Sequence, residues 1–205
     1  MKIVFSRTLA PALRWVERVL FASSLAMLAC CALAIFDAWT FQRTELDRSP
    51  MRPPALQSGP PTPPAAGGVL GRLEISRLGL SAVVVEGTSR SNLRRAVGHI
   101  RGTGLPGQPG NIGLSGHRDT FFRPLKDILR NDTITLRTPG TPATAGRTYR
   151  YRVVSTRVVA PTEVSVLEPG SGQILTLVTC YPFYFVGFAP ERFVVRAERT
   201  GGESR

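Results

Sequence analysis

Cysteine and histidine are both scarce in this chain, which has three cysteines and two histidines among its 205 residues. Cys30 and Cys31 lie in an apolar run near the N-terminus, so Cys180 is the only cysteine in the rest of the chain. It has no disulfide partner within its domain, and no Cys-x-x-Cys or Cys/His cluster indicates a zinc site. Cys180 is therefore either a buried apolar thiol, as free cysteines often are, or a reactive one.

Acidic side chains are also few, since 14 Asp and Glu stand against 26 Lys and Arg and give a formal net charge of +12. Residues 69–205 hold most of this excess, with 19 basic and 10 acidic groups. A basic domain suits anionic surroundings such as nucleic acid, a membrane surface or an acidic wall polymer. The arginines are scattered, however, and no zinc-finger or aromatic RNA-binding motif accompanies them, which argues against a nucleic-acid partner.

One long apolar run is present, and it lies near the N-terminus. Residues 19–36 carry no charge over 18 positions and are flanked by Trp15 and Trp39. This is about the length of a transmembrane helix, and tryptophans are typical of its interfacial ends. The basic excess in residues 1–18 predicts a cytoplasmic N-terminus and an extracytoplasmic C-terminal domain at a bacterial plasma membrane.

Cleavage of this run is the competing interpretation. As a signal peptide the run is long, and its cleavage site at 32–34 is marginal. The residues before Cys30 match a lipoprotein cleavage site poorly, because the usual small residue in the middle is missing. We favour a single-pass anchor that is retained.

Residues 37–68 have the composition of a linker. Seven prolines lie between positions 50 and 64, and apolar residues are few. Such a segment cannot bury enough surface to offset the entropy lost on ordering. Because proline-rich chain rises about 3.1 Å per residue in polyproline II, we expect a spacer that holds the domain away from the bilayer.

Residues 69–200 have the pattern of an all-β domain, and a short tail follows at 201–205. Runs of apolar or alternating residues separated by turn residues predict about eight strands, as in a closed β-barrel or a sandwich. The clearest strands are expected at 73–75, 82–85, 112–115, 133–138, 148–159, 173–180 and 192–199. Short helices are expected at 91–97, within 121–129 and, as one turn, at 163–167.

The end of this domain holds the residue types of a thiol acyl-transfer site. Pro182 cannot donate to a sheet ladder, so the preceding strand should end near Cys180 and hold its thiol rigidly. A thiol attacks as a thiolate, and a neighbouring imidazole can take its proton. His117 follows the strand at 112–115 and can face Cys180 at one rim, whereas His99 lies in a glycine-rich loop. Either can be an ordinary structural histidine, and spacing alone does not choose between them.

Three segments resemble the sortase family, and class D sortases in particular. The run Thr176-Leu-Val-Thr-Cys180 is similar to the sortase cysteine signature. The histidine segment is Gly116-His-Arg-Asp-Thr-Phe-Phe122, and further similarity covers Cys180-Tyr-Pro-Phe-Tyr184 and Ala189-Pro-Glu-Arg-Phe-Val-Val195. The resemblance spans roughly residues 69–200 in the right order, and three agreeing motifs are much more specific than one.

The resemblance implies an eight-stranded sortase-type β-barrel and a membrane-anchored cysteine transpeptidase. Such an enzyme cleaves a C-terminal sorting signal of the Leu-Pro-x-Thr-Gly type through a thioacyl intermediate. An amine of a cell-wall precursor or a pilin lysine then accepts the protein. The resemblance also implies roles for Cys180 as the nucleophile, for His117 as the acid/base partner and for Arg192 as the residue that stabilises the oxyanion or holds the substrate. Thr179 is expected to line the substrate site, and His99 corresponds to a loop position near it.

Arg196 is the obvious rival of Arg192, because residues four apart lie on the same face of a regular strand. The family pattern places the functional arginine directly before Phe-Val-Val, which selects Arg192. No insertion or acidic cluster indicates bound calcium, so we expect no required metal or other cofactor.

Two other functions fit the residues. A hydrolytic cysteine peptidase would use the same Cys–His pair but release a free acid, whereas a sortase supplied with a short amine makes an amide. A non-enzymatic, membrane-tethered module would bind anionic envelope polymer through its basic face. In that case a thiol reagent at neutral pH would leave Cys180 unlabelled.

Overall fold

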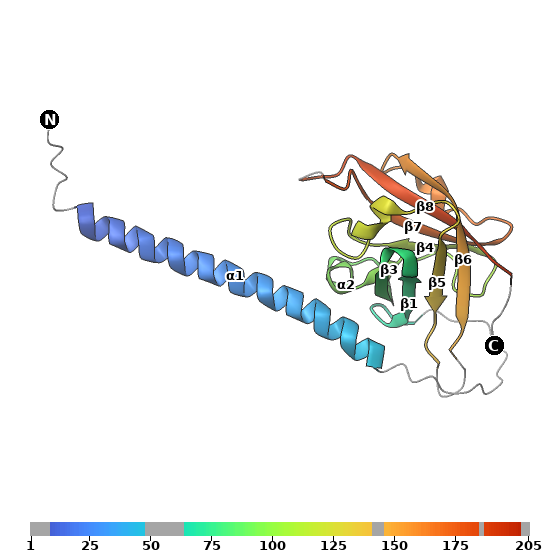
Figure 1. Ribbon diagram of the computed structural model, residues 1–205, viewed down its shortest axis with the longest axis horizontal. Coiled ribbons are helices and arrows are strands. Elements are labelled where there is room, and N and C mark those ends of the chain that lie inside the picture. The colour runs from blue at the N-terminus through green and yellow to red at the C-terminus, as the bar shows by residue number, and fades with distance from the viewer. Residues whose placement is uncertain (1–8, 48–63, 141–145, 185–186, 202–205) are drawn as a thin grey trace. The chain divides into compact units, whose positions relative to one another are not determined.

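The computed structural model describes residues 9–47, 64–140, 146–184 and 187–201. The chain divides into two compact units, residues 1–40 and residues 41–205. The first unit is helical and the second contains the strands (Figure 1).

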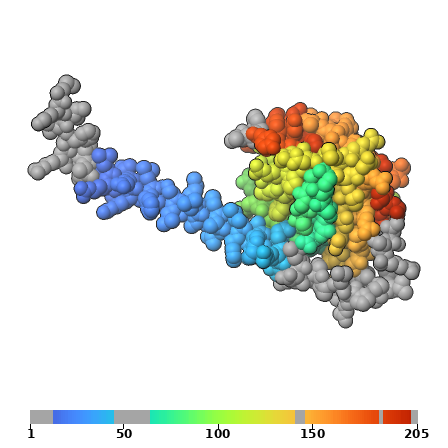
Figure 2. Space-filling view, in the orientation of Figure 1, coloured from blue at the N-terminus to red at the C-terminus, as the bar shows by residue number. Residues whose placement is uncertain are grey.

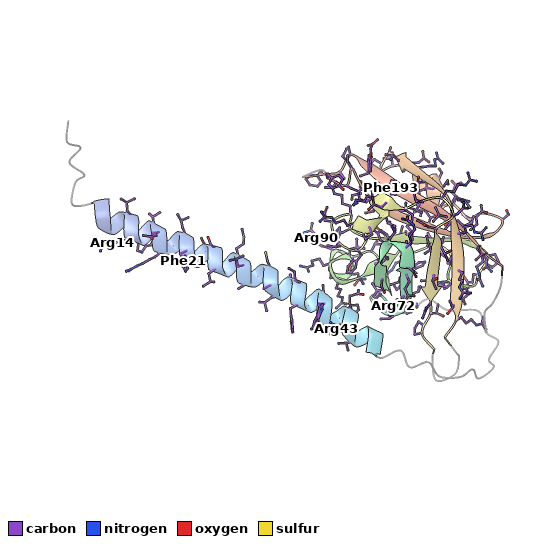
Figure 3. All side chains as sticks on the ribbon, in the orientation of Figure 1. Arg14, Phe21, Arg43, Arg72, Arg90 and Phe193 are labelled. Atoms are coloured by element: carbon purple, nitrogen blue, oxygen red, sulfur yellow. The ribbon has the colours of Figure 1, made fainter. Side chains whose placement is uncertain are left out.

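Helix α1 (Leu9–Asp47) accounts for the described residues of the first unit, continues past residue 40, and contains the expected apolar run. Its segment Leu13–Thr44 is long and apolar enough to cross a membrane. Its large side chains, among them Phe21, are exposed along the helix, as Figures 2 and 3 show. A helix whose apolar residues face outward on all sides is suited to a lipid environment.

The helix continues through residues 37–47, which the sequence pattern placed in the linker. These positions contain neither proline nor glycine, so nothing in the sequence stops the helix before the prolines that begin at Pro50. Positions 48–63 of the expected linker lie outside the described residues.

Eight strands within the described residues close into a barrel, in the order β1-β2-β3-β4-β7-β8-β6-β5. The pairs β2/β3 and β4/β7 are parallel, and the other neighbours are antiparallel. This confirms the expected closed eight-stranded barrel. The strands are β1 (Val69–Ile75), β2 (Leu80–Glu86), β3 (Val97–His99), β4 (Gly110–Ser115), β5 (Thr133–Arg137), β6 (Thr148–Val159), β7 (Gln173–Tyr181) and β8 (Glu191–Arg199).

Alternate residues of the strands fill the barrel interior with aliphatic side chains. Leu175 and Leu177 of β7 are fully buried, as are Ile112 and Leu114 of the neighbouring β4. Burying such a side chain contributes about 1.5–3 kcal/mol. The two strands that lead to the expected catalytic cysteine and histidine are therefore fixed by the core itself.

Short helices connect the strands. They are η1 (Ser76–Leu78), α2 (Arg90–Arg95), η2 (Arg123–Asp127) and η3 (Val164–Leu167). Ser89 caps α2 by accepting a hydrogen bond from the backbone N–H of Asn92 at 3.2 Å. The expected helix at 91–97 is wrong at its end, because Val97 begins β3 and pairs with Val84 of β2. The expected loop at His99 is wrong for the same reason.

Candidate active site

The parallel pairing of β4 and β7 brings the expected histidine and cysteine to the same end of the barrel. Ser115 of β4 lies opposite Val178 of β7. His117 and Cys180 each follow two residues later, and parallel strands run in the same direction, so both side chains reach one rim. The backbone N–H of Gly116 extends the ladder by donating to the carbonyl of Val178 at 3.2 Å.

The antiparallel pairing of β7 and β8 adds the expected arginine. Arg192 is the direct partner of Cys180, whereas Arg196 pairs with Thr176. Four residues of a strand span roughly 13 Å, so Arg196 lies well away from the rim. One guanidinium nitrogen of Arg192 donates to the carbonyls of Ala189 and Glu191 at 3.2 and 2.9 Å.

These side chains line one pocket of about 250 Å³. Within the pocket the residue His117 is exposed and the residue Cys180 is half-buried. The full lining is His117, Arg118, Asp119, Cys180, Gly187, Phe188, Ala189 and Arg192. The pocket therefore brings together a thiol, an imidazole and a guanidinium, the groups that thiol acyl transfer uses.

A buried aromatic ring, that of Phe122, packs against the histidine segment. Phe122 is fully buried, and its backbone N–H donates to the carbonyl of His117 at 3.1 Å. A Cβ atom on Gly116 would lie 2.9 Å from the Phe122 ring, so only glycine allows this close approach. The segment 116–122 thus turns over the core and presents the imidazole at the rim.

An aromatic cluster fixes the chain just beyond the cysteine. The Phe183 and Phe193 rings meet edge to face with centroids 5.3 Å apart, and Tyr181 stacks on Phe193 at 6.3 Å. Figure 3 labels Phe193 on β8. Such pairs contribute about 0.5–1.5 kcal/mol each beyond their buried area. The cluster holds the first residues of the loop that leaves β7.

Thr179 does not lie among the residues that line the pocket. Its side chain is buried and donates a hydrogen bond to the carbonyl of Gly116 at 2.8 Å. In the structure Thr179 therefore supports the histidine segment, where the sequence pattern predicted a position on the wall of the substrate site.

His99 lies in the barrel wall on β3, enclosed by hydrogen-bonding groups. Its Nδ1 is 2.7 Å from the Glu86 carboxylate, and its Nε2 is 3.0 Å from the carbonyl of Gly104. Only 2% of the residue is exposed, and it does not line the pocket. The structure thus separates two histidines that spacing alone left equivalent.

No cluster of three or more His, Cys, Asp or Glu side chains that could hold a metal ion occurs in the part of the chain that is described. The absence of a metal requirement remains a prediction. We expect turnover to be unchanged when EDTA is added, and a loss of activity that calcium restores would contradict it.

Comparisons with known proteins bear on the same region. A family model described as the Sortase domain matches residues 73–200. Sortase D of Bacillus subtilis (strain 168) is 34% identical over 137 residues, which is 66% of this chain and 66% of that protein. Further curated relatives are covered over 35% and 49% of their lengths, so the chain spans less than two thirds of each of these proteins.

Two solved structures extend the likeness to three dimensions. A sortase D5 transpeptidase of Clostridium perfringens has a TM-score of 0.57 and 25% identity, over 66% of this chain and 81% of that one. Sortase C from Clostridium perfringens SM101 has a TM-score of 0.56 and 32% identity, over 66% of this chain and 72% of that one.

Proposed function

Because this chain belongs to the sortase family of cysteine transpeptidases, we propose that it cleaves a C-terminal sorting signal of the Leu-Pro-x-Thr-Gly type and transfers the cleaved protein to an amine. The observation that carries this proposal is the meeting of His117, Cys180 and Arg192 in one pocket. The three residues come from three strand ends, and the barrel register places them together.

The first half-reaction forms a thioester. The Cys180 thiolate attacks the carbonyl carbon of the substrate threonine, and the carbonyl oxygen becomes an oxyanion. The Arg192 guanidinium is permanently charged and has several donors, which suits it to stabilise that oxyanion. Collapse of the intermediate breaks the Thr–Gly bond, and the His117 imidazolium gives its proton to the departing glycine amine.

The second half-reaction transfers the acyl group. An acceptor amine attacks the thioester carbonyl, His117 takes a proton from that amine, and the Cys180 thiolate leaves as the amide forms. A thioester conserves acyl-transfer potential, so no ATP is needed. The position of Cys180 in the lining of the pocket supports this sequence, because a substrate carbonyl and an acceptor amine have to meet at its sulfur.

We further propose that α1 crosses the plasma membrane once, with the N-terminus in the cytoplasm and the barrel outside. The exposed apolar residues of α1 and the basic side chains before residue 19 support this arrangement. The partners are then a protein with a sorting signal and an amine acceptor, which is a cell-wall precursor or a pilin lysine. Nucleic acid is not among them.

Peptide turnover by the full-length protein in detergent tests the activity. A peptide that ends in a sorting signal is mixed with a short amine, and mass spectrometry follows the thioester on Cys180 and the amide product. Wild type is expected to form both, and Cys180→Ala neither. Release of free acid alone would indicate a hydrolytic peptidase. A thiol that resists iodoacetamide at neutral pH would favour the non-enzymatic module.

A further inference from the structure

Arg118 differs from the residues on either side of it. His117 and Asp119 are exposed, whereas only 6% of Arg118 is exposed. Arginine is almost never buried unless its charge and its N–H groups are paired, because desolvation of the cation is costly. The burial of Arg118 at the edge of the pocket therefore needs a cause.

That cause is the connection between β7 and β8 (Figure 1), which the structure describes at residues 182–184 and 187–190. Arg118 Nη1 donates to the carbonyl of Pro182 at 3.0 Å, and Nη2 donates to the carbonyl of Gly187 at 3.1 Å. Pro182 lies two residues after Cys180, and Gly187 lies on the returning limb. The guanidinium of Arg118 thus donates hydrogen bonds to both the outgoing and the returning limb of the loop.

The neighbouring carboxylate does not explain this arrangement. Arg118 Nε lies 3.4 Å from Asp119 Oδ1, but the Asp119 side chain is 71% exposed. Exposed ion pairs contribute little, since water screens them. The carbonyl contacts are charge-assisted and have good geometry, so they are the stronger reason for the buried position.

The loop held in this way forms one wall of the pocket. Gly187, Phe188 and Ala189 line the pocket together with His117 and Cys180. The aromatic cluster of Tyr181, Phe183 and Phe193 holds only the outgoing limb. Arg118 connects the returning limb to the histidine segment, so it sets the distance between the two sides of the pocket.

We propose that Arg118 is a positioning residue, which fastens the β7–β8 loop to the histidine segment and thereby shapes the pocket where substrate meets Cys180. Arginine is required because its planar fork reaches two carbonyls at once, whereas lysine offers one point charge. The kinetic part of this inference rests on the proposed function, and the structural part does not.

The test compares Arg118→Lys and Arg118→Ala with Arg123→Lys, in full-length protein in detergent. Arg123 is an exposed arginine that directly follows the histidine segment, at the start of η2, and serves as the matched control. Three quantities are measured: backbone hydrogen exchange, the pH profile of Cys180 alkylation by iodoacetamide, and kcat and KM for a sorting-signal peptide with a short amine.

Both Arg118 variants are expected to speed exchange at residues 183–184 and 187–189 by tenfold or more, with β4 unchanged. A displaced pocket wall can lower kcat/KM on the order of 10²-fold, which we expect chiefly as a higher KM. The alkylation profile should match wild type, and Arg123→Lys should match it in all three measurements. Methylguanidinium at low millimolar concentration should partly restore Arg118→Ala, and methylammonium should not.

The inference would be overturned if the Arg118→Lys variant kept both the hydrogen exchange rates of the wild-type loop and the wild-type peptide turnover. A shifted alkylation profile would also overturn it, because Arg118 would then act on the thiol through its charge. If the alanine variant does not fold, the lysine variant decides. If wild type does not turn over the peptide, the proposed function fails, and hydrogen exchange still decides whether Arg118 fastens the loop.

Discussion

Arg192 and Arg196 of β8 carry the same functional group but lie at different distances from Cys180 along the strand. Arg192 lies directly opposite Cys180, whereas Arg196 lies opposite Thr176. A donor can stabilise an oxyanion only when it lies about 2.7–3.1 Å from that oxygen. With the two arginines roughly 13 Å apart along the strand, only one of them can contact a carbonyl bonded to the Cys180 sulfur.

Arg192→Ala is therefore expected to lose about 2.7–4 kcal/mol of transition-state stabilisation, or on the order of 10²–10³ in kcat, with the fold intact. Arg192→Lys should recover only part of the rate, because a point charge does not reproduce the guanidinium fork. Steady-state kinetics on a sorting-signal peptide measure both effects.

Arg196→Ala is the matched control for Arg192, since it removes an arginine from the same strand. It should stay within a few-fold of wild type. If Arg196→Ala were the inactive variant and Arg192→Ala the active one, the assignment of the oxyanion role to Arg192 would be wrong.

His99 and His117 also have the same chemistry, and burial separates them. Each ring nitrogen of His99 faces an acceptor, the Glu86 carboxylate or the Gly104 carbonyl. Removing the ring leaves a carboxylate that is only 6% exposed with the guanidinium of Arg101 at 3.7 Å. Such a contact is too long to replace the lost hydrogen bond.

His99→Ala should therefore lower the free energy of unfolding by about 3 kcal/mol, because it leaves a buried carboxylate without its hydrogen-bond partner. Activity per folded molecule should remain substantial. His117→Ala should show the reverse, with near-normal stability and almost no turnover. Urea unfolding and peptide kinetics on both variants test the contrast, and an inactive but stable His99→Ala protein would contradict it.

At the scale of elements, an ion pair joins η1 to the loop that precedes β5. Arg77 of η1 contacts both carboxylate oxygens of Asp132, just before β5, at 2.6 Å. The hydrogen bond from Arg77 lowers the pKa of Asp132 more than burial raises it, and the backbone N–H of Leu129 lowers it further. The ionised carboxylate is therefore the form that stabilises the fold.

The depressed pKa gives this pair a defined pH dependence. Its stabilisation is complete above the unfolded-state pKa of Asp, near 3.9, and is lost as the pH falls through the lower folded-state pKa. Asp132→Asn should cost about 1.5 kcal/mol at pH 7, the lower end for bonds to charged groups, because Arg77 is partly exposed. Urea unfolding from pH 7 to pH 2 should show wild type and variant converging at the acid end; a constant gap would disprove the linkage.

The strands that sequence predicts well are those whose own pattern is strong. β6 alternates for part of its length and forms at the expected residues 148–159, and β7 ends one residue after Cys180, where Pro182 blocks the ladder. The sequence does not predict β3, because Val97–His99 is too short for any periodicity. It is a strand only because β2 and β4 pair with it, which no local pattern reveals.

In the candidate site, too, some residues can be predicted from local sequence patterns, and others cannot. The segments around His117, Cys180 and Arg192 resemble sortase motifs, and the barrel register brings these residues to one pocket. Thr179 could not be placed in this way. It lies beside Cys180 in the sequence, but its side chain donates to the carbonyl of Gly116. The sequence does not reveal the role of Arg118, because its carbonyl partners lie 64 and 69 positions away. Such contacts depend on tertiary structure and leave no signal in local spacing.

At the scale of the whole molecule, the question is on which side of the membrane the barrel works. The charges before the apolar run are Lys2, Arg7, Arg14 and Arg18 against a single Glu17. Residues 37–47, after the run, carry Asp37, Arg43, Glu45 and Asp47. By the positive-inside rule, the more basic flank stays in the cytoplasm, so residues 64–205 are expected to be outside.

Protease accessibility tests this topology directly. Trypsin added to intact spheroplasts should cut within the arginine-containing segment between α1 and the barrel or digest the barrel, while a cytoplasmic marker protein stays whole. Protection of residues 64–205 until the membrane is broken would place the barrel on the wrong side. Replacing Lys2, Arg7, Arg14 and Arg18 by glutamine should then produce a protected fraction, because the charge difference that orients the helix is gone. Unchanged accessibility in that variant would mean that the flanking charges do not set the orientation.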